Sequence, residues 1–516
     1  MTHSTQSRSA HAGAFVRRHF VLILACVTLV PAAAWHVAQL IAIMASRIDL
    51  PMDIEWMEGG ALYHAYRMLH GETVYGDPRL GFVPFAYPPL HAALLALLGR
   101  IVSLDFSSGR ALSIFFFAGM LAVCTWEVLS HAPRRGTALL GVVALLGYVG
   151  ASVPLVLSWY DLVRNDCPAL AFPMLAAACV SGRLSLGRIV ACAVLLSLAF
   201  YTKQTAIFFM GFVGAAVFLR SQRLGLLLGC VTGLLCAATL VGLQWMSDGW
   251  YLRWISVLNT HPVSAWRLWV GLRMVLEFAP FLPGVAVLAG WLRWRGRLST
   301  RSLVWLAIFA AALPTSLIPF AKLGGFNNNL IPLVVVGGLT STLVVLDGFD
   351  ALAAHARRTA APRLERAVAA GLVLGGAMFF FVNRYDARAF MPSPALREHV
   401  AELNDLVASL EGSVVMPSHP FIPVRNGKTN EQMHVMAWWD ASNSPLGPQL
   451  DLEGFFARSR PDWLLAAPVE LAFPPLAAQI DRRFRFERRL PAPAQTLVGA
   501  APTGPELLFR KRPRSG

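Results

Sequence analysis

Long apolar runs alternate with short polar segments over most of the chain. Between residues 20 and 383 most of these runs are roughly 17 to 25 residues long, the length of a helix that crosses the hydrocarbon core of a bilayer. The pattern predicts a mostly α-helical, polytopic transmembrane bundle of about 11 to 13 helices. The expected spans fall near residues 20–45, 111–130, 137–157, 168–180, 188–201, 205–219, 224–245, 271–291, 302–320, 329–346 and 367–383.

Composition and charge restrict the class of protein. Of 516 residues, 56% are hydrophobic and 14% are charged, and the mean hydropathy of +0.55 is too high for a soluble globular chain of this size. The formal net charge is +15, but the basic residues occur in short clusters between apolar runs, as in the cytoplasmic loops of membrane proteins. We therefore expect membrane lipids, and not nucleic acid, to surround the chain.

The same charge pattern predicts the topology. Residues 1–19 are polar and end in a basic cluster, so we expect a cytoplasmic N-terminal tail and a first helix that leads to the outer face. Residues 89–102 are apolar but number only about 14, which is short for a crossing. If they crossed, most of the later basic loops would lie outside. We therefore expect this segment to lie along or dip into the outer leaflet.

Three carboxylates follow the first apolar run, in a chain that is otherwise poor in acids. Asp53, Glu55 and Glu58 lie within six positions, in an aromatic outer loop that spans residues 47–109. If a helix begins near Glu55, then Glu55 and Glu58 share a face, so one could act as a base while the other orients a hydroxyl. A solvated loop whose acids favour a helix N-terminus explains the same pattern.

Further polar groups are predicted to meet these carboxylates on the outer face. Asp161 and Arg164 have the spacing of a mutually neutralising pair, or of a phosphate clamp held by a carboxylate. Lys203 marks a tight turn, as a snorkelling lysine or a phosphate contact. The remaining groups are Asp166, Lys322, Asn327, Asn328 and Asn329, and the asparagines suit a plain turn as well as sugar recognition.

After about residue 383 the chain becomes more polar and richer in proline. Residues 413–416 and 462–466 have the pattern of buried strands, and residues 393–410 that of an amphipathic helix. We therefore expect residues 384–516 to form a small α/β domain on the outer side, with residues 510–516 frayed.

The order of these pieces resembles the GT-C superfamily of polytopic glycosyltransferases. Such proteins have a carboxylate motif after the first helix, then a Gly-x-x-x-Tyr turn and a Tyr-Pro-Pro-Leu stretch. The similar segments are Glu55-Trp-Met-Glu58-Gly59, Gly71-Glu-Thr-Val-Tyr75 and Tyr87-Pro-Pro-Leu90, followed by Arg164-Asn-Asp166, Lys203-Gln-Thr205 and Asn327 to Asn329. The likeness covers residues 20–383. The family often has adjacent Asp-Glu where this chain has Met57-Glu58, so the identity of the base stays open.

The resemblance implies transfer of a sugar from a polyprenyl-phosphate donor to a lipid, glycan or protein acceptor, with inversion at the anomeric carbon. Glu58 or Glu55 would then be the base, with Asp53 as a second carboxylate. The implied phosphate contacts are Arg164, Lys203 and Lys322, and the implied positioning residues are Asp161, Asp166, Tyr87, Asn327, Asn328 and Asn329. A divalent cation such as Mg²⁺ or Mn²⁺ is compatible with the carboxylates, but no metal-ligand spacing requires one. High Arg and Ala content is typical of a GC-rich bacterial genome, so we expect the cytoplasmic (inner) membrane, with the C-terminal domain in the periplasm or outside the cell.

Two other functions remain open at this point. A secondary transporter or lipid flippase could use the same ionisable groups as a relay, but such proteins usually have internal repeats and charges near the middle of helices. No two matching halves are evident here. A non-catalytic assembly factor is the third hypothesis, and it predicts that Glu55 and Glu58 face open water.

Overall fold

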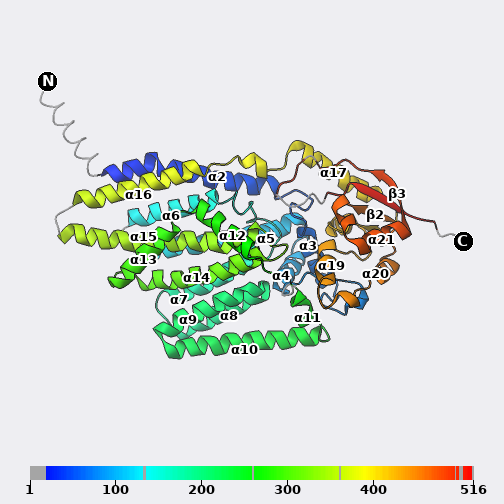
Figure 1. The fold of residues 1–516 in the computed structure, drawn as a ribbon, viewed down its shortest axis with the longest axis horizontal. Helices are drawn as coiled ribbons and strands as arrows, with labels where there is room; N and C mark the ends of the chain where they lie inside the picture. The colour runs from blue at the N-terminus through cyan, green and yellow to red at the C-terminus, as the bar shows by residue number, and fades with distance from the viewer. Residues whose placement is uncertain are drawn as a thin grey trace, which may run out of the picture.

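The computed structural model describes residues 19–131, 135–257, 261–358, 362–493, 495–498 and 504–513. The molecule is elongated, with a bundle of long helices at one end and a C-terminal domain packed on the other (Figure 1). The predicted cytoplasmic tail, residues 1–19, lies outside the described residues apart from His19.

Within the described residues, six helices are long and apolar enough to cross a bilayer. They are α2 (Leu29–Arg47), α5 (Phe106–His131), α10 (Gln222–Met246), α14 (Thr300–Ala321), α15 (Ile331–Arg358) and α16 (Pro362–Val382). Shorter apolar helices of 14 to 17 residues complete the bundle. They are α6 (Arg135–Ala151), α7 (Asp166–Ser181), α8 (Leu186–Thr202) and α9 (Ile207–Arg220). The predicted number of 11 to 13 spans is therefore not confirmed, because these four helices are shorter than the roughly 20 residues of a full crossing.

The span predicted at residues 271–291 is wrong as a single helix. The chain instead forms α12 (Ala265–Phe278) and α13 (Leu282–Trp294), which meet at 81°. Pro280 and Pro283 cause the break, since proline has no backbone N–H and its ring clashes with the preceding turn. Counting this bent pair as one span raises the number of candidate spans to seven.

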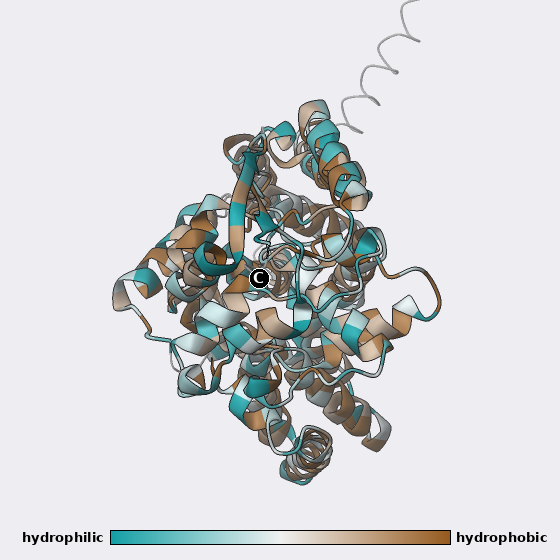
Figure 2. Ribbon diagram, turned by 90° about the vertical axis from the view of Figure 1, so that its right-hand side faces the viewer, coloured by the Kyte–Doolittle hydropathy of each residue, from teal (hydrophilic) through white to brown (hydrophobic). Residues whose placement is uncertain are grey.

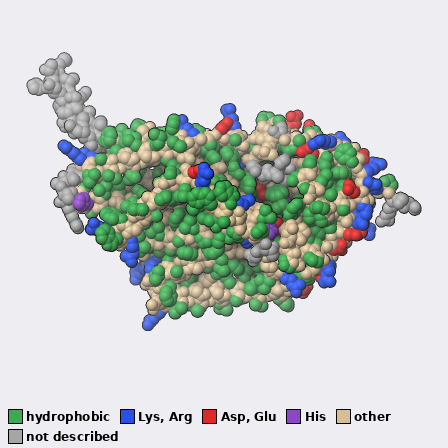
Figure 3. All heavy atoms as spheres, in the orientation of Figure 1, with side chains coloured by type: hydrophobic (Ala, Val, Ile, Leu, Met, Phe, Trp, Pro, Cys, Tyr) green, Lys and Arg blue, Asp and Glu red, His purple; other side chains and the backbone are tan. Residues whose placement is uncertain are grey.

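The outer surface of the bundle is apolar. Leu234 and Trp245 of α10 are 71% and 82% exposed, whereas α15 is buried at the centre. Figure 3 shows hydrophobic side chains over the helical part, while Asp and Glu gather at the end that carries the C-terminal domain. Such a surface is suited to contact with lipid tails.

The outer loop contains two helices, α3 (Glu58–Leu69) and α4 (Leu90–Gly99), with the short η1 (Pro78–Leu80) between them. The predicted segment 89–102 forms α4, whose ten residues span about 15 Å at the α-helical rise. This is half of a bilayer core of about 30 Å, so α4 is too short to cross. It packs against α3 and α5.

The C-terminal domain contains a four-stranded sheet with the order β1-β2-β4-β3, in which only the β1–β2 pair is parallel. Its helices and strands are η5 (Ala387–Phe390), α17 (Pro394–Ser409), β1 (Val414–Val415), α18 (Phe421–Arg425), α19 (Val435–Ser442), η6 (Gly447–Gln449), α20 (Leu452–Ser459), β2 (Trp463–Ala466), η7 (Pro468–Ala472), α21 (Pro474–Arg483), β3 (Phe484–Arg489) and β4 (Leu507–Lys511). The predicted helix and both predicted strands are confirmed as α17, β1 and β2. The expectation of a frayed end is wrong for Arg510 and Lys511, because β4 pairs with strands on both sides.

The C-terminal domain packs directly on the outer loop. Arg425 bonds Asp105 at 3.1 Å, and the backbone N–H of Gln432 donates to the Tyr63 hydroxyl at 3.0 Å. Figure 2 looks onto this end of the molecule, where hydrophilic segments are frequent. The loop that carries Asp53, Glu55 and Glu58 therefore lies between the helical bundle and the C-terminal domain.

Candidate active site

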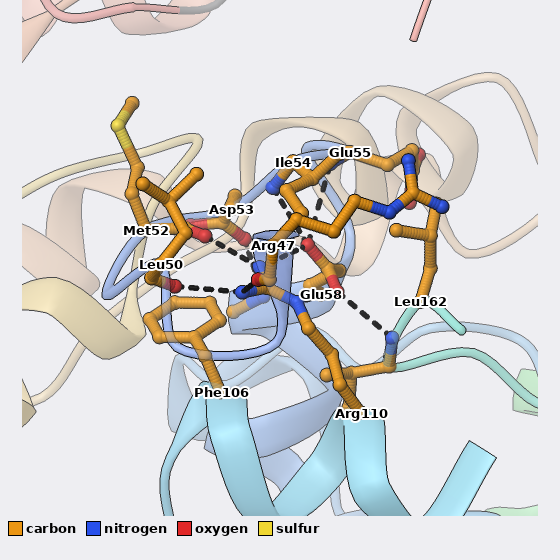
Figure 4. Close-up of polar contacts among 12 residues, drawn as sticks. Arg47, Leu50, Met52, Asp53, Ile54, Glu55, Glu58, Phe106, Arg110 and Leu162 are labelled. Carbon is orange, nitrogen blue, oxygen red and sulfur yellow. Dashed lines mark hydrogen bonds and ion pairs between the residues drawn. The ribbon is translucent and has the colours of Figure 1, made fainter. Parts of the chain in front are cut away.

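Glu58 opens α3 and is completely buried. Its two oxygens accept from Arg110 Nε and Nη2 at 3.0 and 2.8 Å, and from the backbone N–H groups of Ile54 and Val163 at 2.6 and 2.9 Å. Figure 4 shows this carboxylate between the loop and Arg110, which comes from α5. Burial alone would raise the pKa of Glu58, but Arg110 and the two N–H groups hold it below its ordinary value. Glu58 is therefore a poor proton acceptor and fixes the path of the loop.

Arg110 also organises the loop that precedes Glu58. Its guanidinium donates to the backbone carbonyls of Arg47, Leu50 and Met52 at 2.9, 2.6 and 2.6 Å. Arg110 is not among the predicted site residues, although an arginine near the start of an apolar helix is a signal that could have identified it. One buried cation thus sets the course of residues 47–58.

Asp161 does not pair with Arg164, contrary to the spacing argument. It forms a completely buried pair with Arg47, whose Nε donates to Asp161 Oδ2 at 2.6 Å. The i, i+3 argument fails because residues 152–165 form turns and bends instead of a helix, with Leu157 and Ser158 at positive φ. Asp161 therefore ties this segment to the end of α2.

Glu55 lies on the other side of the loop and has far fewer partners. It is 2% exposed, and its Oε2 accepts from the Met57 N–H at 3.2 Å and lies 3.4 Å from Arg164 Nη1. Burial raises the pKa of Glu55 to about 7, although Arg164 opposes the shift. Neither Glu55 nor Glu58 faces open water. Glu55 is the acid of this pair that can take up a proton near neutral pH.

Arg164 connects Glu55 with a small, partly open cavity. Its guanidinium carbon lies 5.9 Å from the centre of the Tyr87 ring and 5.3 Å from that of Trp159. Tyr87 and Arg164 both line this cavity, which we call the Tyr87 cavity. The Tyr87 carbonyl accepts from the Tyr75 hydroxyl at 2.6 Å, and this bond fixes the wall of the cavity.

Asp166 gathers three of the predicted outer loops into one cluster. Lys203 Nζ donates to Asp166 Oδ1 at 2.7 Å and to Asn329 Oδ1 at 3.1 Å. Asn328 Nδ2 donates to both Asp166 oxygens at 3.0 Å. Asp166, Lys203 and Asn329 line a second, smaller cavity. Arg164 joins the cluster, because its Nε lies 3.7 Å from Asp166 Oδ2.

The predicted residues Asn327 and Lys322 lie at the edge of this arrangement. Asn327 begins η4 (Asn327–Leu330) and donates to the Leu155 carbonyl at 2.7 Å. Lys322 follows α14, and its backbone forms an isolated bridge with Val263. Lys322 lines neither of the two cavities described above.

Asp53 faces the C-terminal domain. Its Oδ2 lies 2.8 Å from His419 Nδ1, and its Oδ1 accepts from the Gly59 N–H. A Cβ at Gly59 would come within 2.8 Å of Asp53 Oδ1, so this contact requires glycine. Burial raises the pKa of Asp53, although His419 opposes the shift. His419 lies 366 residues further along the chain, and no sequence signal linked it to Asp53.

The described residues contain no cluster of typical metal ligands. Among them, no group of three or more His, Cys, Asp or Glu side chains could hold a metal ion. The carboxylates of the site instead form ion pairs or hydrogen bonds with arginine, lysine, histidine and backbone N–H groups.

Comparison with known proteins identifies the fold. Neither a protein-family model nor a curated protein matches the sequence. Among solved structures, ArnT from Cupriavidus metallidurans bound to undecaprenyl phosphate is similar, with a TM-score of 0.55 and 12% identity over 93% of this chain and 98% of that chain. Its apo form has a TM-score of 0.52 and 14% identity over 92% and 97%. The apo oligosaccharyltransferase of Archaeoglobus fulgidus has a TM-score of 0.47 and 11% identity over 85% and 70%.

The fold of this chain is therefore similar to that of ArnT. The structural likeness to ArnT reaches beyond residues 20–383, to which the motifs were confined, because it covers 93% of the chain.

Proposed function

We propose that this GT-C-fold protein is a membrane glycosyltransferase that moves a sugar from a polyprenyl-phosphate donor to a lipid, glycan or protein acceptor, with inversion. The observation that carries the proposal is Glu55, a buried carboxyl whose pKa is raised to about 7 and which lies 3.4 Å from Arg164. Arg164, but not Glu55, lines the Tyr87 cavity. An acid that ionises near neutral pH next to a fixed cation suits a reaction in which a hydroxyl loses its proton while a phosphate leaves.

The chemistry follows from these two groups. The acceptor hydroxyl gives its proton to Glu55 as its oxygen attacks the anomeric carbon. The bond between that carbon and the phosphate oxygen breaks, and the bond electrons remain on the departing polyprenyl phosphate. A single displacement from the opposite face inverts the anomeric configuration. Arg164 attracts the leaving phosphate more strongly than the donor diester, because the phosphate gains charge, and this difference accelerates the step.

The other residues take supporting roles in this proposal. Glu58 holds the loop through Arg110, and Asp53 links it to the C-terminal domain through His419. Lys203 adds positive charge next to Arg164 through their shared partner Asp166. Tyr87 forms the wall of the donor cavity, and the groups that hold the surrounding loops are Asp161, Lys322, Asn327, Asn328 and Asn329.

In this proposal the site lies at the outer face of a bacterial cytoplasmic membrane. The donor's isoprenoid tail would lie between helices of the bundle, so the reaction needs no soluble nucleotide. Residues 384–516 would then be the extracytoplasmic domain and residues 20–383 the membrane domain.

A transport assay and a transfer assay separate this function from that of a flippase. The purified protein in lipid nanodiscs receives a panel of undecaprenyl-phosphate sugars, with a membrane extract as the source of acceptors. We expect release of undecaprenyl phosphate that depends on the extract. In proteoliposomes the same protein should not move a fluorescent undecaprenyl-phosphate sugar between leaflets. Lipid movement without release of undecaprenyl phosphate would replace the transferase with a flippase.

A further inference from the structure

His91 lines the Tyr87 cavity, and one of its two ring nitrogens, Nε2, has no hydrogen-bond partner among the described residues. It lies in the first turn of α4, and its side chain is 6% exposed. A buried polar atom without a partner destabilises the folded state, so proteins seldom keep one without a reason. The unpartnered nitrogen belongs to a residue of the cavity wall, where a ligand could supply its partner.

A second nitrogen without a hydrogen bond within the described part of the chain belongs to Arg164, which also lines this cavity and whose Nε lies 3.7 Å from Asp166 Oδ2. Arg164 is 7% exposed. The other histidine of the cavity, His64, differs, because its Nε2 accepts from the Phe85 N–H at 3.2 Å. In the neighbouring cavity Lys203 is held by Asp166 and Asn329. Among the described side chains that line the Tyr87 cavity, the buried nitrogens without a hydrogen bond are therefore His91 Nε2 and Arg164 Nε.

The start of α4 adds a preference for an anion. Pro88, His91 and Ala92 line the cavity at the N-terminal end of this ten-residue helix, whose first turn contains no acid. The backbone N–H groups at a helix N-terminus carry a partial positive charge, which favours a phosphate or another anion. The cavity is thus lined by an imidazole, a guanidinium and a helix N-terminus. These three groups together are suited to bind a phosphate.

We propose that His91 is a phosphate-binding residue of the donor site, with its Nε2–H donating to a phosphate oxygen of the polyprenyl-phosphate group next to Arg164. This inference rests on the proposed function and identifies the Tyr87 cavity, not the cavity at Lys203, as the phosphate site. Lys203 then acts on the phosphate only through Asp166 and Arg164.

The test measures binding of undecaprenyl phosphate to the full-length protein in nanodiscs. His91→Phe keeps a ring of similar size but removes the donor, and we expect its affinity to fall about 10- to 100-fold, as for loss of a hydrogen bond to a charged group. His91→Gln retains an N–H donor and should recover part of the affinity. His70→Phe is the matched control, because His70 is an exposed histidine outside the cavity, and it should bind as the wild type does.

Undecaprenol, which lacks the phosphate, separates the head group from the tail. We expect its weak binding to be the same in the wild type and in His91→Phe. Equal affinity of both proteins for undecaprenyl phosphate would overturn the role of His91, and so would an equal loss for undecaprenol, which would assign His91 to the tail groove. If the wild type itself fails to bind undecaprenyl phosphate, the proposed donor class fails together with this inference. Thermal unfolding shows whether each variant is folded. If His91→Phe does not fold, the comparison of His91→Gln with the wild type tests the role of His91.

Discussion

Replacing Glu58 with glutamine tests whether this carboxylate holds the loop or performs the chemistry. Glu58→Gln keeps the shape of the side chain but leaves the buried Arg110 guanidinium without its counter-charge. The new amide NH₂ also faces Arg110 or backbone N–H groups, all of which are donors. The carboxylate and Arg110 are both 0% exposed, so water cannot replace the lost partner.

The size of the effect follows from that burial. Removing one member of a buried, hydrogen-bonded ion pair destabilises a protein by about 3–5 kcal/mol, because the other charge stays buried and unpaired. We therefore expect Glu58→Gln to lower the free energy of unfolding by this amount at pH 7. Activity per folded molecule should stay within about tenfold of the wild type, since Glu58 is not assigned the proton transfer.

Equilibrium unfolding in mixed micelles, followed by tryptophan fluorescence, measures the first quantity. Glu55→Gln is the matched control in the same loop, and it should not lower the free energy of unfolding, because burial already favours the neutral form of Glu55. An unchanged stability of Glu58→Gln combined with a loss of activity of several hundredfold would refute this reasoning and make Glu58 the base.

The remaining predictions concern pH and two other ion pairs. Because burial raises the pKa of Glu55 from 4.5 to about 7, wild-type stability should fall by about 3 kcal/mol as pH rises through this interval, and Glu55→Gln should remove that part of the dependence in unfolding titrations. For the same reason, kcat/KM should fall about tenfold per pH unit below pH 7, as measured by release of undecaprenyl phosphate. Lys203→Met should lower kcat/KM per folded molecule at least tenfold, because the negative charge of Asp166, no longer neutralised by Lys203, offsets the positive charge of Arg164. Asp161→Asn should lower stability by about 3–5 kcal/mol in the unfolding assay and leave the KM for donor unchanged, because its partner Arg47 becomes an unpaired buried charge.

The sequence predicted the groups that converge but not their pairing. Lys203, Asp166 and Asn329 come from three separate segments, and hydropathy with the charge rule places all three segments on one face. Their contacts in the structure agree with that expectation. Asp161 and Arg164 were paired by helical spacing, and this failed because the segment is not helical.

The partners that the sequence analysis missed act over long distances. Arg110 lies 52 residues from Glu58, and His419 lies 366 residues from Asp53. Periodicity and local spacing describe contacts within a turn or two of helix, so they contain no information about such pairs. Strands β3 and β4 were not predicted from the sequence either. β3 reads Phe-Arg-Phe-Glu-Arg-Arg and is mostly exposed, so it lacks the apolar alternation by which strands are recognised.

The measurement that tests the central claim most directly compares Glu55→Gln with wild type in the release of undecaprenyl phosphate. Both proteins are assayed in nanodiscs at equal amounts of folded protein, with the undecaprenyl-phosphate sugar and the membrane extract that support wild-type turnover. Loss of a general base predicts a 10²- to 10⁴-fold lower kcat, with binding of undecaprenyl phosphate retained. A Glu55→Gln variant that turns over at the wild-type rate would contradict the assignment of Glu55 as the base.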